Sequence, residues 1–286
     1  LLSHTGFTEI MTYSFYGVAD REAFGFAPAQ HIEIANPLNP DQTHLRKSLL
    51  PSLLSKVKEN MRHTEAIRLF EWESVFEKSK ASEVKESKIL ALASVSREKG
   101  SYEFARLKGA LENIFESAGV RDAVFVSHAV PAAGDEWHRT QSADILIQGK
   151  KIGTIGTLMP FILKQFGITA GVAVAEIDTE FFRESITTER RFEALPRFPF
   201  AVRDISLVFS GRQKSQAVGE LMYEVGAPLI RSAELFDVFE RDGKRNLAFH
   251  LSFGADGRTL TGREMDEAFD RIVREVRERF GGELHQ

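Results

Sequence analysis

The 286-residue sequence contains no cysteine, and none of its apolar runs approaches the ~20 residues that a membrane-spanning helix needs. The missing cysteines exclude disulfides, thiolate metal sites and cysteine nucleophiles, and they fit a reducing compartment. The opening residues, LLSHTGFTEI, lack the basic flank and long apolar stretch of a signal peptide. We therefore predict a cytoplasmic protein with no membrane contact.

An excess of positive charge is also missing. The formal net charge is −4, and residues 195–286 carry 14 Lys plus Arg against 15 Asp plus Glu. Proteins that bind nucleic acid normally show a basic face or stripe. Charge alone therefore gives no indication of a nucleic-acid partner.

Common catalytic motifs are absent as well: no HExxH, GxSxG or Walker pattern occurs. A hydrolase or metal site built on His138, Asp144 and their neighbours stays open as a catalytic alternative. The glycines and lysines of GKKIGTIG, residues 149–156, lie between two predicted strands, so we interpret them as a hairpin turn and not as a phosphate loop.

Length and composition favour two soluble globular domains, because 43% of the residues are hydrophobic and 27% are charged. Residues 180–200 run from a strand end into a charged stretch with Pro196 and Pro199, which is typical of a linker. We place the boundary near residue 190. The chain does not begin with Met, and we expect it to be a piece of a longer polypeptide.

Residues 191–286 show the order βαββαβ. The predicted strands are 203–209, 230–240, 245–253 and 283–286, with Arg241-Asp242-Gly243 as the turn between the second and third. Ser215 can cap the first helix, which ends at Gly226. Thr261 and Glu264 have capping-box spacing at the start of the second helix, which stops at Gly281 and Gly282. This order predicts a ferredoxin-like sandwich with two helices on one face of an antiparallel sheet.

Residues 1–190 contain more strand than helix. Helices are expected at 44–62, 102–118 and 160–166, and strands at 8–16, 31–35, 67–77, 88–96, 123–128, 142–148, 151–158 and 171–178. Such a succession predicts an antiparallel or mixed sheet within an α+β protein. We interpret Arg46 and Lys47 as snorkelling charges on a core helix, with contact to a partner protein as the alternative.

Several motifs, in order, resemble one family. The segments GFTEIMTYSF (6–15), NPLNPDQTHLRKSLLPSLL (36–54), LFEWESVFEK (69–78) and VAVAEIDTEFF (172–182) are similar to the core module of the bacterial-type phenylalanyl-tRNA synthetase β subunit. RFPFAVRDISLVFS and ELFDVFERDGKRNLAFHL resemble the anticodon-binding module that closes that subunit. Around residues 138–141 the chain departs from the family, with Arg139-Thr140-Gln141 for Pro-Gly-Arg.

The resemblance implies a class II synthetase-like module without an active site at 1–190, and a ferredoxin-fold anticodon-binding domain at 191–286. It implies as partners the α subunit in an (αβ)₂ assembly and tRNA(Phe), with ATP and magnesium on the α subunit and no cofactor here. In one respect the sequence itself agrees with the absence of an active site from residues 1–190. Glu71 and Glu73 lie on the strand where a phosphate-binding site needs positive charge.

The resemblance also implies which side chains meet the anticodon. Family members commonly have tyrosine at the position of Phe239, stacking on the first anticodon base, and serine at that of Asn246. Asp237 and Phe239 are two residues apart, so they share a strand face, and Asn246 stands across the turn. The predicted phosphate contacts are Arg197, Arg203, Lys244 and Arg245.

Simpler interpretations accompany these predictions. Phe239 could pack in the core, Asp237 could accept hydrogen bonds from the hairpin backbone, and the charges of residues 270–283 could form a solvated helical face with i,i+4 pairs. A ferredoxin-like regulatory or protein-interaction module with no RNA role is the alternative to the whole functional reading.

Overall fold

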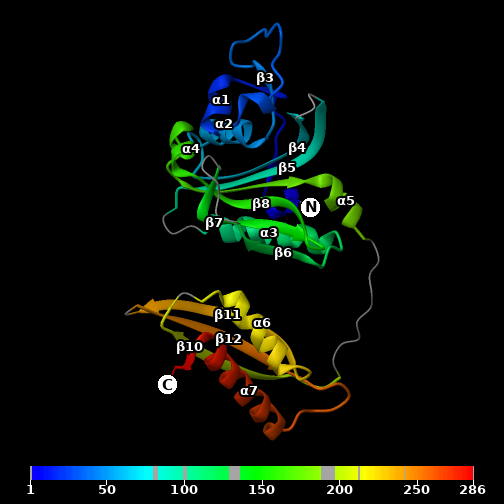
Figure 1. The fold of residues 1–286 in the computed structure, drawn as a ribbon, viewed down its shortest axis with the longest axis vertical. Coiled ribbons are helices and arrows are strands. Elements are labelled where there is room, and N and C mark those ends of the chain that lie inside the picture. The colour runs from blue at the N-terminus through cyan, green and yellow to red at the C-terminus, as the bar shows by residue number, and fades with distance from the viewer. Residues whose placement is uncertain are drawn as a thin grey trace. The chain divides into compact units, whose positions relative to one another are not determined.

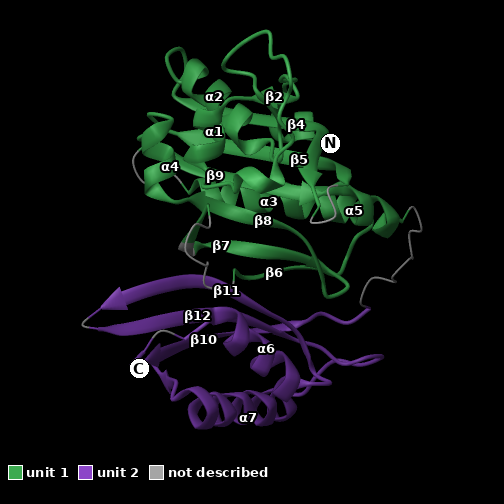
Figure 2. Cartoon of the chain, turned by 45° about the horizontal axis from the view of Figure 1, so that its top comes forward, with its two compact units in different colours: residues 1–190 green, residues 191–286 purple. Residues whose placement is uncertain are grey.

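The computed structural model describes residues 2–79, 83–98, 102–128, 136–187, 197–211, 213–241 and 243–285. The chain forms two compact units, Leu1–Arg190 and Arg191–Gln286, which Figure 2 colours separately. Residues 188–196 at the expected linker and Asp242 in the expected turn lie outside the described residues.

The first unit is built on a seven-stranded mixed sheet, one of the two sheet types that the sequence predicted. Its strand order is β1-β4-β5-β9-β8-β7-β6, and only the β1–β4 pair is parallel among the described strands. In that order the strands span Thr8–Glu9, Ala66–Lys78, Val84–Ser96, Gly171–Asp178, Lys150–Leu158, Trp137–Ile147 and Ala123–Ser127.

Helices cover both faces of this sheet (Figure 1). The helices α1 (Val18–Ala23), α2 (Leu50–Asn60) and α4 (Pro160–Gln165) pack with Ala91, Ala93 and Val95 of β5 in one apolar cluster. The helix α3 (Glu103–Ser117) packs with Leu90 and Leu92 in the other. Because both faces are covered, the second half of β5 is buried continuously from Leu90 to Ser96 and contains no charged residue.

Two predicted strands of this unit are wrong in extent. The expected strand 8–16 divides into β1 and β2 (Phe15–Tyr16), which belong to different sheets, because the chain leaves the large sheet where Thr12 binds the Glu71 carboxylate. The expected strand 31–35 is reduced to a single bridge between Glu33 and His44.

The predicted helix 44–62 begins six residues later, at Leu50. Residues His44–Leu45 form the short strand β3, which pairs with β2. Pro51 explains the difference, because it lies in the first turn of α2, where its missing N–H is not needed, whereas a helix from 44 would place it in the interior. The short helices α1 and α5 (Thr179–Ser185) were not predicted.

The second unit has the predicted βαββαβ order. Its elements are β10 (Ala201–Phe209), α6 (Ser215–Gly226), β11 (Ile230–Arg241), β12 (Lys244–Phe253), α7 (Gly262–Phe280) and β13 (Glu283–Leu284), and the sheet order is β11-β12-β10-β13. All its strand pairs are antiparallel, and both helices lie on one face (Figure 2). The structure therefore confirms the ferredoxin-like topology.

The helix boundaries of this unit follow from local capping. Thr261 Oγ1 accepts a hydrogen bond from Glu264 N, and Glu264 Oε2 accepts one from Thr261 N, so the predicted capping box is present. Gly281 ends α7 in the left-handed conformation at φ +68°. Ser215 was predicted as the cap of α6 but is its first residue, and Lys214 holds the cap position.

A buried ion pair ties together the start of the first unit. Arg46 and Glu71 are 1% and 0% exposed, and Arg46 Nη1 lies 2.9 Å from Glu71 Oε1. Thr12 joins them: its hydroxyl accepts from Arg46 and donates to Glu71. Arg46 Nε also donates to the Ser74 carbonyl. The interpretation of Arg46 as a snorkelling charge on a helix is therefore wrong.

We predict that Arg46→Met lowers the free energy of unfolding of the first unit by ~3–5 kcal/mol, because it leaves the Glu71 carboxylate buried without its cation. Arg46→Met with Glu71→Leu should recover at least about 2 kcal/mol, because the uncompensated charge is gone. Urea unfolding followed by tryptophan fluorescence measures this unit alone, since both tryptophans, Trp72 and Trp137, lie in it.

The matched control is Lys88→Met, which breaks the Lys88–Glu73 ion pair between β5 and β4, whose side chains are 50% and 35% exposed. An exposed pair contributes about 1 kcal/mol or less. Equal losses for Lys88→Met and Arg46→Met would contradict the argument.

Candidate nucleic-acid interface

The sheet of the second unit has one covered and one open face. Odd-numbered residues of β12, from Leu247 to Phe253, pack with Ile205, Leu207 and Phe209 of β10 against α6 and α7. Successive side chains of a strand alternate between faces, and directly paired residues share a face. The even-numbered residues of β12, among them Asn246, Ala248 and His250, therefore lie on the face without helices.

The three predicted anticodon-binding residues meet on this open face. Phe239 is paired with Asn246 across the hairpin, and Asp237 is paired with Ala248. The Phe239 side chain is 43% exposed, and it lies on the side of the sheet away from the apolar core. The geometry thus favours a surface role for Phe239 over core packing.

The polar groups of these residues can receive a ligand. Ser206 on β10 donates a hydrogen bond to Asn246 Oδ1 at 3.0 Å, which fixes the amide and turns its Nδ2 donor away from Ser206. Within the part of the chain that the structure describes, the exposed carboxylate of Asp237 has no hydrogen-bond or ion-pair partner. Among the described residues, the hairpin backbone donates no hydrogen bond to Asp237, which the simpler interpretation required.

The four predicted phosphate contacts lie in different places. Lys244 is exposed at the hairpin end of β12 and shares the parity of Asn246, so it borders the open face. Arg197 is exposed ahead of β10. Arg203 pairs with Asp266 of α7 at 2.7 Å, and Arg245 donates to the Gln213 carbonyl, so both lie on the helix side. The structure does not bring the four together.

The sequence did not predict a role for two aromatic rings on the open face, those of Phe236 and His250. Phe236 stacks on His250, with ring centroids 3.9 Å apart and planes 11° from parallel. His250 Nδ1 lies 2.6 Å from the Asp204 carboxylate. A β-bulge at Phe236 sets this arrangement, and no pattern of residue types in β11 marks it.

The helix α7 carries i,i+4 ion pairs on its surface, Arg263–Glu267 and Arg279–Glu275. The second pair lies within residues 270–283, where the sequence predicted a solvated charged face with such pairs. This interpretation is confirmed.

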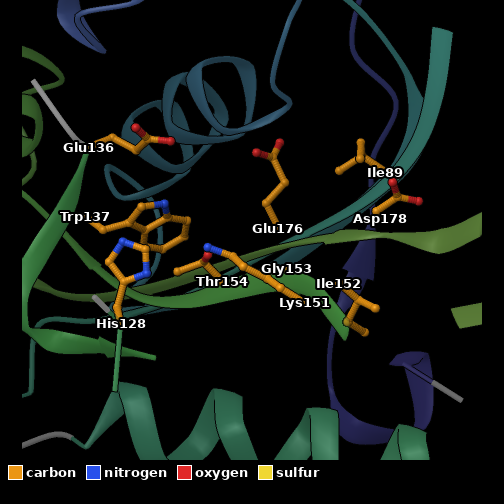
Figure 3. A pocket seen from close by; sticks show the side chains of 10 residues that line it. All are labelled: Ile89, His128, Glu136, Trp137, Lys151, Ile152, Gly153, Thr154, Glu176 and Asp178. Atoms are coloured by element: carbon orange, nitrogen blue, oxygen red, sulfur yellow. The ribbon is translucent and has the colours of Figure 1, made fainter. Parts of the chain in front are cut away.

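The first unit contains a cavity of about 540 Å³ above β8 and β9, shown in Figure 3. Its wall carries Glu136, Glu176 and Asp178, with Lys151 as a lining cation. No arginine is among the described residues that line it, and Arg46 is committed to Glu71. Such a lining does not fit the phosphates of ATP, which require concentrated positive charge.

Glu176 is one of the residues that line this cavity. Its carboxylate accepts hydrogen bonds from Ser48 Oγ at 2.9 Å and from Leu49 N at 2.8 Å. Burial raises the pKa of Glu176 to about 7, although these two hydrogen bonds lower it. Glu176 thus links β9 to the start of α2.

The residues of the catalytic alternative have structural partners. The Asp144 carboxylate lies 2.6 Å from both His128 Nδ1 and Lys151 Nζ, and it accepts from Thr154 Oγ1. The His128 and Lys151 contacts outweigh desolvation and lower the pKa of Asp144. Across the described ranges, no group of three or more His, Cys, Asp and Glu could hold a metal ion. The turn before β8 is the predicted hairpin, with Gln148 and Gly149 at positive φ.

No helix in the described residues has the length and apolar character to cross a membrane.

Comparison with known families agrees with both units. The family described as phenylalanyl tRNA synthetase beta chain CLM domain matches residues 1–179, and the ferredoxin-fold anticodon binding domain matches residues 196–285. The chain is 31% identical over 301 residues to the phenylalanine–tRNA ligase beta subunit of Bacillus thuringiensis, covering 100% of this chain and 37% of that protein. It is 32% identical to the one from Moorella thermoacetica, covering 98% and 37%. The chain thus spans about 37% of the length of these relatives.

Among solved structures, a pyrrolysyl tRNA synthetase from Desulfitobacterium hafniense superposes with a TM-score of 0.52 at 19% identity, covering 65% of this chain and 66% of that one. At 19% identity, this similarity shows a shared fold only.

The two family matches define a protein of the aminoacyl-tRNA synthetase class, with a mixed-sheet CLM domain followed by a ferredoxin-fold anticodon-binding domain. More specifically, the chain belongs to the phenylalanyl-tRNA synthetase β chain family. The resemblance predicted from its motifs is confirmed.

The raised pKa of Glu176 predicts a pH dependence of stability. Between pH 4.5, its ordinary value, and about 7, the folded chain keeps a proton that the unfolded chain releases. The free energy of unfolding should therefore fall as pH rises through this window, by roughly 1–3 kcal/mol, and this contribution should be constant above pH 8.

Glu176→Gln is the comparison, because it keeps an acceptor for Leu49 N and cannot ionise. Urea unfolding followed by tryptophan fluorescence at pH 5, 6, 7 and 8 should show the variant gaining stability relative to wild type as pH rises. The difference isolates this carboxyl, because His31, whose pKa burial lowers, titrates in both proteins. Parallel pH profiles would contradict the assignment.

Proposed function

We propose that this chain is the non-catalytic part of a phenylalanine–tRNA ligase β subunit that recognises the anticodon of tRNA(Phe) and docks on the α subunit. The observation that carries the proposal is the open sheet face, where Phe239, Asn246 and Asp237 lie together away from the helices. Single-stranded RNA is recognised in this manner, by stacking on aromatic rings and by hydrogen bonds to base edges.

Each residue has a distinct role in the proposal. The Phe239 ring stacks on the first anticodon base, the Asn246 amide and the Asp237 carboxylate bond the edges of bases, and Lys244 contacts a phosphate at the hairpin end. Phe239 lacks the hydroxyl that the family's tyrosine supplies, so its contribution is stacking alone. Arg197, Arg203 and Arg245 remain predicted phosphate contacts, of which Arg203 and Arg245 must leave their present partners to reach RNA.

Residues 1–190 act as scaffold in this proposal. Glu176, Glu136 and Asp178 line the cavity where phosphates would need cations, so ATP, magnesium and phenylalanine bind on the α subunit. Met11, Tyr13 and Leu38 are 82%, 74% and 104% exposed, and Met11 and Tyr13 line a second cavity of about 560 Å³. Large exposed apolar side chains mark protein interfaces. We assign this surface to the α subunit in a cytoplasmic (αβ)₂ enzyme that attaches phenylalanine to its tRNA.

Phe239→Ala and Asn246→Ala should each weaken binding of a tRNA(Phe) anticodon stem-loop to the 286-residue chain, the first by about 5- to 100-fold, because one stacked base is lost. Fluorescence anisotropy with labelled RNA measures the affinity. Lys244→Ala should weaken binding to all loop sequences alike and reduce the salt slope by about 0.7.

Tyr223→Ala is the matched control, because Tyr223 is 53% exposed on α6, on the helix side of the unit. It should bind as wild type does. If Phe239→Ala and Asn246→Ala also bind as wild type does, or if the chain binds no RNA, the regulatory or protein-interaction alternative is favoured.

Co-expression with a phenylalanyl-tRNA synthetase α subunit should give a complex that purifies as one species, and Met11→Asp with Tyr13→Asp should dissociate it, because charge is placed in an apolar contact. The chain alone should not catalyse phenylalanine-dependent pyrophosphate exchange. Exchange by the isolated chain, or a complex indifferent to both substitutions, would refute the scaffold assignment.

A further inference from the structure

A β-bulge in β11 re-aims the side chains of the open face. Leu235 is paired with Phe249 on the core side, but the next registered pair is Asp237 with Ala248, so Phe236 is the extra residue. With the register that the hairpin sets at Phe239 and Asp237, an unbulged strand would pair Phe236 with Phe249 and direct it toward the helices. The bulge therefore brings Phe236 onto the open face, where the hairpin register already places Asp237 and Phe239.

Phe236 is held flat by a fixed partner. His250 lies beneath it, and the carboxylate of Asp204, directly opposite His250 on β10, accepts a hydrogen bond from His250 Nδ1. Since a carboxylate only accepts, Nδ1 carries the proton and the imidazole is oriented. Phe236 is 50% exposed, and among the described residues its ring stacks only on His250, so the ring can stack on one further planar group.

From these observations we propose that Phe236 and His250 form a second stacking platform for an unstacked nucleobase of the RNA loop. The proposal rests on the anticodon-reading function above. Along β12, His250 lies four positions after Asn246, which is paired with Phe239. At a rise of ~3.3 Å per residue the two platforms lie about 13 Å apart, so they hold different bases.

The surrounding charges identify the ligand as a base edge and not a phosphate. Asp204 accepts a hydrogen bond from His250, and Glu234 of β11 is paired with His250. Asp237 is paired with Ala248, two positions before His250 on β12. These carboxylates repel phosphate, but they accept hydrogen bonds from the exocyclic amino groups of adenine, cytosine or guanine. The platform therefore favours an amino-bearing base over uracil.

The test is a double-mutant cycle between protein and RNA. The 286-residue chain and its Phe236→Leu, Phe236→Tyr, Phe239→Ala and Tyr223→Ala variants are titrated with tRNA(Phe) anticodon stem-loops in which each loop base is made abasic in turn. Phe236→Leu keeps an apolar side chain on a half-exposed site, so the fold is retained, and circular dichroism checks it. Phe236→Tyr keeps the ring and should bind as wild type does.

We expect Phe236→Leu to weaken binding by about 5- to 100-fold, the range for one stacked base. One abasic position should cost wild type affinity and cost Phe236→Leu nothing further, and it should differ from the position that couples to Phe239. Uracil at that position should bind more weakly than an amino-bearing base.

The outcomes separate the two proposals. If Phe239 couples to a base and Phe236 couples to none, or to the same base, the second platform is refuted while anticodon reading stands. If neither residue couples to any base, both proposals fail. Equal loss for Phe236→Leu and Phe236→Tyr also refutes the platform, because stacking would then not be what Phe236 contributes.

Discussion

The structure of the second unit depends on one constraint: among its described residues, both helices cover the same face of a four-stranded sheet. The apolar residues of β10 and β12 pack against α6 and α7, and every second residue is thereby directed to the uncovered face. Because the apolar core lies on one side of the sheet, folding of this unit does not require particular residues on the other side. The open face can therefore carry Phe239, Asn246 and Asp237, which contribute nothing to the apolar core.

The sequence predicted this unit well because its signals are local. Thr261 and Glu264 mark a helix start by spacing, Gly281 marks a helix end, and the hairpin brings Phe239 opposite Asn246 by simple register. The bulge at Phe236 could not be predicted, because it is a property of pairing between two strands and leaves no pattern within one of them. The stack of Phe236 on His250 depends on that bulge, so it was also missed.

The first unit was harder to predict where contacts are distant in sequence. From the sequence, Arg46 was interpreted as a snorkelling charge on a helix. Its burial is explained by two partners that are distant in sequence: Glu71, 25 residues later, and Thr12, 34 residues earlier. Replacing a buried ion pair by apolar residues is often neutral or stabilising, so stability alone does not explain it. Its clearer effect is geometric, because Arg46 and Glu71 together fix the backbone near Thr12, next to the exposed Met11 and Tyr13.

The acidic residues around the aromatic rings of the open face have a consequence for the proposed binding of RNA. Affinity for nucleic acid comes mainly from phosphates, and the open face offers Lys244 at one end while Asp204, Glu234 and Asp237 lie along it. Stacking and base-edge contacts then supply discrimination, with little attraction that is independent of sequence. Under the proposed function, such a surface would bind RNA weakly by itself and discriminate strongly between bases. In the proposed assembly, cations elsewhere must provide the affinity, and the open face then decides which RNA is retained.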